Sequence, residues 1–489
     1  MDKLNICLIN DSFPPVIDGV ANAVKNYAQI INERHGKAAV VTPYYPGADD
    51  AGYSFPIYRY PSLMLPKKVG YRAGIPFSPE LMAQVQAERF DLIHSHCPVT
   101  STLLARSMRD QLDLPLVLTY HTKFDIDIAN AVRGKLLQEE LIRLLVKNIS
   151  ACDEVWTVSR GAGENLRSLG FEGDYVVMPN GVDFPKGRVS PEAVEAVTGG
   201  YDLPAGLPVL LFVGRMMWYK GIRIILDALK LLDEEGTDFR MVFVGGGGDK
   251  EEIRAYCSEL GLNGKVIFIE PIRDRERIRA WYCRGDLFLF PSTFDTNGLV
   301  VREAAACALP SVLVRGSCAA EDVADGETGF LMEENAASMA EILRRLLPRL
   351  DLVRRVGKQA QQGIYLSWED SVANAWEGYG AVIERYRRGQ YDRPRNTADE
   401  ALRNLGSLME LVNRLDSVRS SLEGRVDAVR SDLEDRMDAA RSDLEGRVDS
   451  ARINLENLGR AALEENLPLL RRKREREEAD PVQREDRFL

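Results

Sequence analysis

The sequence is poor in the residues and motifs that build metal centres, disulfide frameworks and membrane spans. Only four histidines occur among 489 residues and no HExxH segment is present, which disfavours a metal site built from several histidines. The seven cysteines are scattered and form no CxxC pair, so reduced thiols in a cytosolic protein are expected. No apolar run reaches the roughly 18 residues that a membrane-spanning helix needs, and the first six residues lack the build of a signal peptide.

Basic residues are also too few for a general nucleic-acid-binding protein. The 63 lysines and arginines are outnumbered by 74 aspartates and glutamates, which gives a formal net charge of −11. A surface of that sign repels a phosphate backbone, so no nucleic-acid partner is expected. At 489 residues the chain is too long for one compact core, and two globular domains are the default expectation.

Short apolar runs alternate with helical patterns in two series, one on each side of a break rich in proline and glycine. The first series has strand-like runs at Leu4–Ile9, Ala38–Thr42, Leu92–His94, Leu116–Tyr120, Glu154–Val158 and Tyr175–Met178. The second series has them at Val209–Val213, Arg240–Val244, Val266–Ile269 and Leu287–Phe290. Apolar strands separated by helices are typical of parallel sheets that are covered on both faces.

This alternation predicts an α/β chain with two doubly wound, Rossmann-like domains. We place the first domain at 1–185, a linker at 186–207 and the second domain at 208–366. One more amphipathic helix at 367–390 is expected to close the second domain.

From about Ala398 the sequence changes to an eleven-residue repeat with dense charge. The copies begin at Arg419, Arg430, Arg441 and, more weakly, Arg452. Because eleven residues fill three helical turns, the apolar positions stay on one face. We predict one long helix over 398–466 that forms a coiled coil and a homo-oligomer, followed by a charged, disordered tail at 467–489. An amphipathic membrane helix and a helix packed on its own domains are the alternatives.

The loop after the first strand is suited to a ligand. It leads to a helix at the carboxyl edge of the predicted sheet, where open α/β folds bind their ligands. Gly19 directly precedes the helical run, so a phosphate or a sugar could approach the backbone closely at the helix N-terminus. Ordinary turn chemistry is the other interpretation of this glycine.

Two cations flank the loop that follows the first strand of the second series. Gly214 and Arg215 come at the end of that strand, and Lys220 lies just before the next helix. Two positive charges beside helix amides form a binding site for a diphosphate. Solvated surface cations are the alternative, but the position at the ligand edge of the sheet favours the site.

Two acids bracket a loop further along the second series. Asp295 and Glu303 are eight residues apart, and Asn297, Gly298 and Leu299 lie between them. Such a loop can present one carboxylate to sugar hydroxyls, while the second carboxylate, at a helix start, accepts a hydrogen bond from a ribose.

These motifs, in this order, resemble the retaining glycosyltransferases of family 4. That family has the GT-B architecture, in which two Rossmann-like domains face each other across a cleft. The matching motifs are the Gly19 loop, His94-Ser95-His96, segment 177–183, the Arg215/Lys220 pair, the Gly245–Gly248 turn and the acid-x7-acid loop ending at Glu303. The resemblance covers residues 4–388, and segments 11–24 and 119–125 look most similar to the branch that contains diacylglycerol glucosyltransferases.

The resemblance implies a role for each matched residue. Arg215 and Lys220 would neutralise the donor diphosphate and stabilise the departing nucleoside diphosphate. Asp295, where the family usually has glutamate, would contact sugar hydroxyls, and Glu303 would bind the donor ribose. The remaining members of the implied donor site are Gly19, Gly214, Asn297, Gly298 and Leu299.

Three histidines end predicted strands of the first series. The resemblance places His121 under the transferred sugar, beside the reacting carbon; a polar residue satisfied at a strand end is the alternative. One of His94 and His96 faces the cleft, or both have a packing or supporting role.

No carboxylate is placed like the covalent nucleophile of retaining glycosidases. The resemblance therefore implies front-face attack, in which the leaving phosphate helps to deprotonate the acceptor. Asp125-Ile126-Asp127 has the DxD pattern of metal-dependent transferases, but it lies on the acceptor side, where we expect a surface loop. We predict no cofactor and no essential metal; the donor is expected to be a nucleotide-sugar, a UDP-hexose.

The acceptor side offers two segments that combine apolar and basic residues. Segment 61–69 with Arg72, and a helix at 133–147, suit peripheral contact with an anionic membrane. A leucine stripe that faces the core is the other interpretation of the helix.

We therefore expect a metal-independent hexosyltransferase that acts on a lipid such as diacylglycerol. Glucose is the first candidate for the transferred hexose. Its location would be cytoplasmic, at the cytoplasmic face of the membrane if the acceptor is a lipid. A transferase for a soluble sugar or polysaccharide, an epimerase of GT-B shape and a non-catalytic scaffold that works through the coiled coil are the alternatives. The complete set of paired cations and acids argues against the scaffold.

Overall fold

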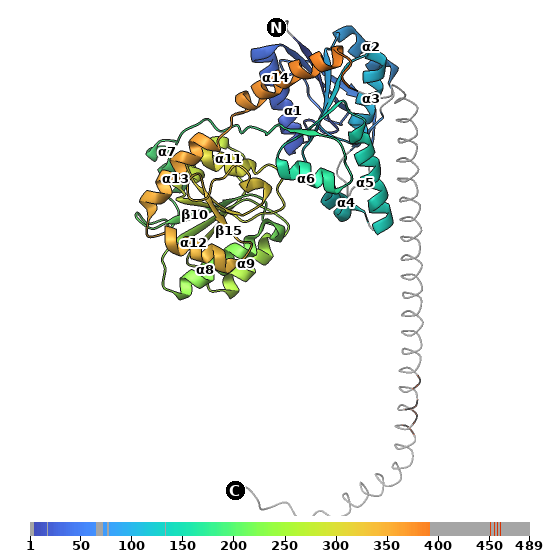
Figure 1. Ribbon diagram of the computed structural model, residues 1–489. Helices are drawn as coiled ribbons and strands as arrows, with labels where there is room; N and C mark the ends of the chain where they lie inside the picture. The colour runs from blue at the N-terminus through green and yellow to red at the C-terminus, as the bar shows by residue number, and fades with distance from the viewer. Residues whose placement is uncertain are drawn as a thin grey trace, which may run out of the picture. The chain divides into compact units, whose positions relative to one another are not determined.

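The computed structural model describes residues 4–16, 18–64, 72–75, 78–132 and 134–391, together with positions 450, 454, 457 and 460 (Figure 1). The described residues before 392 belong to one compact unit. The predicted repeat helix at 398–466 and the charged tail lie almost wholly outside the described residues. The coiled coil and the homo-oligomer therefore stay predictions.

The first lobe is built on a seven-stranded parallel sheet with the strand order β3-β2-β1-β6-β7-β8-β9. Its strands are β1 (Asn5–Ile9), β2 (Lys37–Pro43), β3 (Ile57–Tyr60), β6 (Leu92–Ser95), β7 (Leu116–Tyr120), β8 (Glu154–Thr157) and β9 (Tyr175–Val177). β1, β6 and β7 are buried along their whole length, because helices cover both faces of the sheet. The strand order reverses between β1 and β6, and open α/β sheets bind their ligands at such a switch point.

The connections of the first lobe are mostly helices. They are α1 (Gly19–Ile30) with a π-helical turn η1 (Ile31–His35), α2 (Pro79–Glu88), α3 (Thr100–Leu112), α4 (Phe124–Ala131), α5 (Lys135–Ser150) and α6 (Arg160–Ser168). Two short strands, β4 (Ser62–Met64) and β5 (Arg72–Gly74), form a separate antiparallel pair. No helix in the described part of the chain is long and apolar enough to cross a bilayer.

The second lobe is built on a six-stranded parallel sheet with the strand order β12-β11-β10-β13-β14-β15. Its strands are β10 (Val209–Val213), β11 (Arg240–Val244), β12 (Val266–Ile269), β13 (Leu287–Phe290), β14 (Ser311–Val314) and β15 (Phe330–Met332). Its helices and short turns are α7 (Pro191–Thr198), η2 (Trp218–Lys220), α8 (Ile222–Glu234), α9 (Lys250–Glu259), α10 (Arg275–Arg284), α11 (Leu299–Ala306), η3 (Cys318–Ala320), α12 (Ala336–Leu346) and α13 (Leu350–Gly363). Here the order reverses between β10 and β13.

The last described helix, α14 (Trp368–Arg387), packs on the first lobe rather than on the second. Trp376 and Tyr379 of α14 belong to one buried cluster with Tyr27 of α1 and Trp156 of β8, and Figure 1 shows α14 lying along α1. The expectation that this helix closes the second domain is therefore wrong. An apolar stripe predicts that a helix has a buried face but does not identify the surface that covers it.

Candidate active site

Lys220 and Asp295 form an ion pair at the switch point of the second sheet. Lys220 ends the turn after β10, Asp295 lies in the loop after β13, and Lys220 Nζ is 2.7 Å from both carboxylate oxygens. Ser292 Oγ also donates to Asp295, at 2.6 Å. Burial lowers the pKa of Lys220, Arg215 lowers it further, and Asp295 opposes both effects. The two residues predicted to contact diphosphate and sugar thus lie together.

The turn at Lys220 depends on a glycine. Gly221 has a φ of 75°, and a Cβ at this position would collide with the carbonyl oxygen of Pro291 in the loop after β13. Only a residue without a side chain fits both demands. Gly221 therefore brings the loops after β10 and β13 together, and the Lys220–Asp295 pair with them.

Arg215 differs from Lys220 in its surroundings. Its side chain is exposed, and its guanidinium lies 5.9 Å from the ring centroid of Tyr219. It forms no ion pair within the described residues, whereas Lys220 is matched by a carboxylate. The sequence treats the two cations as equivalent, but in the structure Arg215 has the charge that is free to meet a phosphate.

Gly214 lies against the glycine turn that follows β11. Gly214 N donates to Val244 O at 3.1 Å, and Met216 N donates to Gly246 O at 2.8 Å. A Cβ on Gly245 would collide with the carbonyl oxygen of Gly214. The glycine at position 245 is therefore required by the close approach of the two loops, whereas a Cβ on Gly248 would make only ordinary contacts.

Helix α11 begins at the same edge of the sheet. Gly298 precedes it with a φ of 58°, and a Cβ there would lie 2.9 Å from Ala319 Cβ. The first-turn amides of a helix have no partner inside the helix, so the start at Leu299 is suited to an anion or a hydroxyl. The side-chain nitrogen of Asn297, Nδ2, is buried without a hydrogen-bond partner among the described residues.

Glu303 is buried on α11 and both of its carboxylate oxygens have partners from α10. Arg275 Nη2 donates to Oε1 at 2.6 Å, and Tyr282 OH donates to Oε2 at 2.9 Å. Burial, reinforced by Glu303, raises the pKa of Tyr282 well above its usual value. A ribose at Glu303 would share the carboxylate with these two residues. Sequence reasoning missed both, although their spacing of seven places them on one helix face.

His121 follows β7 and reaches the second lobe through its backbone. Its ring is buried, with Nε2 3.0 Å from His96 Nδ1 and Nδ1 3.4 Å from Asn180 Nδ2. Its carbonyl oxygen accepts a hydrogen bond from Thr296 Oγ1 at 2.8 Å, so it adjoins the loop of Asp295. Burial lowers the pKa of His121 to about 3, which keeps the ring neutral.

Two other predicted features have clear positions. Gly19 is the first residue of α1, whose N-cap Asp18 accepts hydrogen bonds from Val20 N and Ala21 N. A Cβ on Gly19 would meet nothing within 4 Å, so packing does not require a glycine there.

Asp125 lies in the first turn of α4 and accepts a hydrogen bond from Asn165 Nδ2 at 3.3 Å. The expected surface loop at 125–127 is therefore helical.

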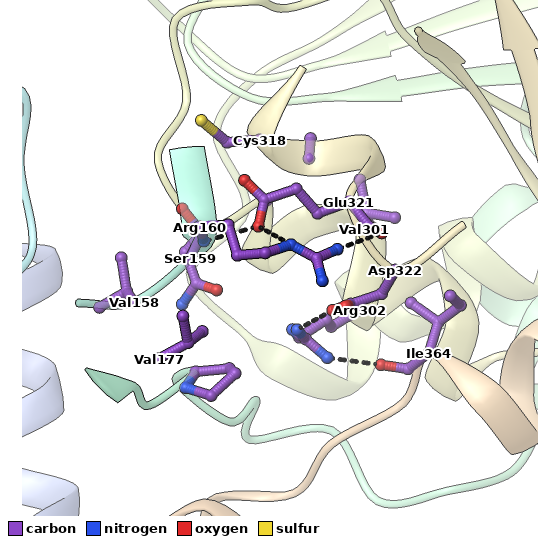
Figure 2. Close-up of a pocket in the computed structure, with 14 residues that line it drawn as sticks. Val158, Ser159, Arg160, Val177, Val301, Arg302, Cys318, Glu321, Asp322 and Ile364 are labelled. Carbon is purple, nitrogen blue, oxygen red and sulfur yellow. Dashed lines mark hydrogen bonds and ion pairs between the residues drawn. The ribbon is translucent and has the colours of Figure 1, made fainter. Parts of the chain in front are cut away.

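A pocket of about 140 Å³ lies between the lobes, with residues from both in its lining (Figure 2). Figure 2 shows Arg160 of α6 and Glu321, which follows η3, bonded to each other at this pocket. Asn297 and Gly298 also line it, so it adjoins the start of α11.

Comparison with known proteins explains this arrangement. The model of the family described as Glycosyltransferase Family 4 matches residues 17–185, and that described as Glycosyl transferases group 1 matches residues 199–363. A D-inositol 3-phosphate glycosyltransferase of Nocardia farcinica is 28% identical over 325 residues, covering 63% of this chain and 71% of the relative. An alpha-monoglucosyldiacylglycerol synthase of Streptococcus pneumoniae is 23% identical over 317 residues, covering 63% and 70%.

Solved structures share the two-lobed fold. A sucrose-phosphate synthase from Thermosynechococcus elongatus superposes with a TM-score of 0.64 at 20% identity, over 78% of this chain and 99% of that one. Anabaena Alr3699/HepE in complex with UDP and glucose gives 0.60 at 19% identity, over 77% and 100%. With both lobes matched by glycosyltransferase families, the chain belongs to the family 4 type of GT-B glycosyltransferases.

Proposed function

We propose that the protein transfers a hexose, with retention, from a nucleoside diphosphate sugar to a membrane lipid acceptor. UDP-glucose is the first candidate donor and diacylglycerol the first candidate acceptor. The reaction uses no essential metal, because cationic side chains and helix amides take over the charge of the leaving diphosphate.

The Lys220–Asp295 pair carries the donor half of this proposal. The pair lies at a switch point, with Arg215 exposed on the same loop and the start of α11 nearby. A diphosphate would meet Arg215, Lys220 and the α11 amides, while Asp295 keeps Lys220 charged and offers its oxygens to sugar hydroxyls. Glu303 would hold the ribose. The solved HepE structure contains UDP-glucose, which makes this donor the first to test.

Exposed apolar side chains on the first lobe support a lipid acceptor. Leu63 and Met64 on β4 are 54% and 72% exposed, and Leu136 at the start of α5 is 85% exposed. The other end of α5 is buried, with Leu145 in the core of the first lobe. The core-facing interpretation therefore holds for the C-terminal half of α5, while the exposed Leu136 leaves its N-terminal end free for the proposed membrane contact. The basic residues of 65–71 and Arg133 lie outside the described residues. The diacylglycerol-related name of the pneumococcal relative agrees with this acceptor class.

The test is transfer from radiolabelled UDP-glucose to diacylglycerol in anionic liposomes, with EDTA present throughout. We expect lipid-dependent turnover that EDTA does not affect and that falls at least about 100-fold in Lys220→Ala, since a charge stabilising the transition state is worth several kcal/mol. Lys265→Ala is the matched control. Lys265 is also partly buried and ion-paired, 2.9 Å from Asp233, but it precedes β12 at the opposite edge of the sheet.

Other outcomes would change the proposal in defined ways. Turnover with a soluble glycan and none with liposomes would replace the lipid acceptor. Loss of activity in EDTA that Mg²⁺ restores would overturn metal independence. An equal loss in both lysine variants would remove Lys220 from the donor site.

A further inference from the structure

His96 lies where the first sheet is expected to bind its ligand. It follows β6 directly, and its backbone N donates to Ile9 O at the end of β1 at 2.9 Å. β1 and β6 are the two strands between which the strand order reverses. The His96 ring is only 2% exposed and its Nδ1 is 3.0 Å from Nε2 of His121, the histidine beside the Asp295 loop.

The neighbours of His121 determine which of its ring nitrogens holds the proton. In this orientation of the Asn180 amide, Nδ2 is the donor and the His121 Nδ1 that it approaches at 3.4 Å accepts, while Asn180 Oδ1 is buried without a partner among the described residues. The proton of the neutral ring then lies on Nε2, and it is donated to Nδ1 of His96. His96 in turn has its proton on Nε2, which is buried and has no hydrogen-bond partner among the described residues.

The two hydrogen bonds of His121 differ in strength. The bond to His96 has an ordinary length of 3.0 Å, whereas the contact with Asn180 is long at 3.4 Å and therefore weak. A substrate hydroxyl could displace the Asn180 amide from Nδ1 at little cost. Nε2 is therefore the more firmly held end of the ring, and Nδ1 is the end whose partner a ligand could replace.

A second layer fixes the ring of His96. His94 lies against it with ring centroids 3.9 Å apart, and Tyr27 of α1 meets it edge-on at 5.3 Å. His94 is itself held at both nitrogens, by Tyr379 OH of α14 at 2.6 Å and by Thr119 Oγ1 at 2.7 Å. A ring held this firmly can impose its hydrogen-bonding pattern on His121.

We propose that His96 is a positioning residue that fixes His121 as the neutral tautomer with its proton on Nε2, so that Nδ1 accepts a hydrogen bond from a substrate hydroxyl. The hydrogen bond from a substrate hydroxyl to His121 rests on the proposed glycosyl transfer. The tautomer of His121 does not depend on that proposal. In this arrangement His121 recognises a hydroxyl and donates no proton during the reaction.

The tautomer can be measured by ¹⁵N NMR on the full chain labelled at histidine, because only four histidines occur. At pH 7.5 we expect His121 to show a protonated Nε2 and a pyridine-like Nδ1. His96→Asn, whose amide oxygen replaces Nδ1 as the acceptor, should keep this pattern. His96→Leu should produce a mixture of tautomers at His121. His35→Asn serves for assignment and should leave the His121 pattern unchanged, because the partly buried His35 ring stacks on Trp376 and not on the other histidines.

Kinetics then connect the tautomer to the reaction. We expect kcat to fall about tenfold or more in His96→Leu and less than about threefold in His96→Asn, with the Kd for UDP unchanged in both. A proton on Nδ1 of His121 in the unmodified protein would overturn the proposal. So would an unaltered His121 pattern in His96→Leu. Should no sugar donor be turned over at all, the proposed function fails, while the NMR result still decides the role of His96.

Discussion

The carboxylate of Glu321 occupies the N-terminus of helix α6 at Arg160, and this contact joins the two lobes. Arg160 N donates to Glu321 Oε2 at 2.7 Å, and the Arg160 side chain donates through Nη2 to the Glu321 carbonyl at 3.2 Å. Gly161 N donates to the other carboxylate oxygen. The start of a helix favours an anion because its amides are unpaired and its dipole is positive there. Usually a residue just before the helix supplies the group that accepts from these amides. Here the carboxylate of Glu321, from the other lobe, supplies part of it.

Replacing Glu321 with alanine should loosen the start of α6. We expect the free energy of unfolding to fall by about 1–2 kcal/mol, the range for loss of a helix cap. Hydrogen exchange at the amides of Arg160 and Gly161 should become faster. Mass spectrometry of exchange checks this, with Glu327→Ala as the control, because Glu327 is exposed in the same part of the chain. Unchanged exchange at α6 would show that the contact does not form in solution.

Removing the Tyr282 hydroxyl should weaken donor binding without touching a charged residue. In Tyr282→Phe, Glu303 loses the donor to Oε2 and keeps Arg275 on Oε1. One hydrogen bond to a charged group is worth about 1.5–3 kcal/mol, so the Kd for UDP should rise about tenfold or more in calorimetry. Tyr256→Phe is the matched control, since Tyr256 OH binds Asp227 on α8 at 2.5 Å. An equal Kd in both variants would contradict a role for Glu303 in binding the donor.

Gly181 should not tolerate alanine. A Cβ there would collide with the backbone of Ser367 and Trp368, where the chain crosses back to the first lobe. Backbone atoms cannot rotate aside, so we expect a loss of about 1–3 kcal/mol, as for an overpacked core. Scanning calorimetry should show a lower Tm for Gly181→Ala. At Gly200 a Cβ would meet nothing within 4 Å, and Gly200→Ala should leave the Tm unchanged or slightly higher.

Acid should destabilise the first lobe through its buried histidines. Burial lowers the pKa of His94, His96 and His121 below the value of about 6.5 that an unfolded chain has. As the pH falls below 6.5, the unfolded chain binds protons that the native chain does not, so the free energy of unfolding decreases. Each histidine contributes about 1.4 kcal/mol per pH unit until its folded pKa is reached.

Urea unfolding between pH 7 and 5 measures this effect. His94→Asn should lower the dependence of the unfolding free energy on pH by one proton, and His35→Asn should lower it by less, because burial lowers the pKa of the half-buried His35 less strongly. Burial raises the pKa of Asp11, which acts with the opposite sign, but it does so equally in every variant. A slope that is the same with and without His94 would contradict the prediction.

Most strands of the two sheets were predictable from sequence because their signal is local, although β3, β14 and β15 were not predicted. Runs such as Val209–Val213 are apolar throughout, and a helical pattern between two of them implies a parallel pair. The start of α11 was predicted wrongly, because Glu303 was expected at a helix start whereas the helix already begins at Leu299. Contacts between distant segments were not predictable from the sequence. Lys220 and Asp295 are 75 residues apart, and no periodicity indicates that their charges neutralise each other. The partners of Glu303 and the lobe that receives α14 were missed because side-chain packing in three dimensions decides them.

The placement of α14 has a consequence for exchanging parts between relatives. The chain passes between the lobes twice, and Val182 N, on the first passage, donates to Leu366 O, on the second, at 3.0 Å. A hybrid enzyme with a single junction near residue 185 would pair the first lobe of one parent with the α14 of the other. Tyr379 would then face a foreign His94 and Trp156. With two junctions, near residues 182 and 366, all residues of each hydrophobic core come from the same parent. Only the donor-binding lobe is then exchanged.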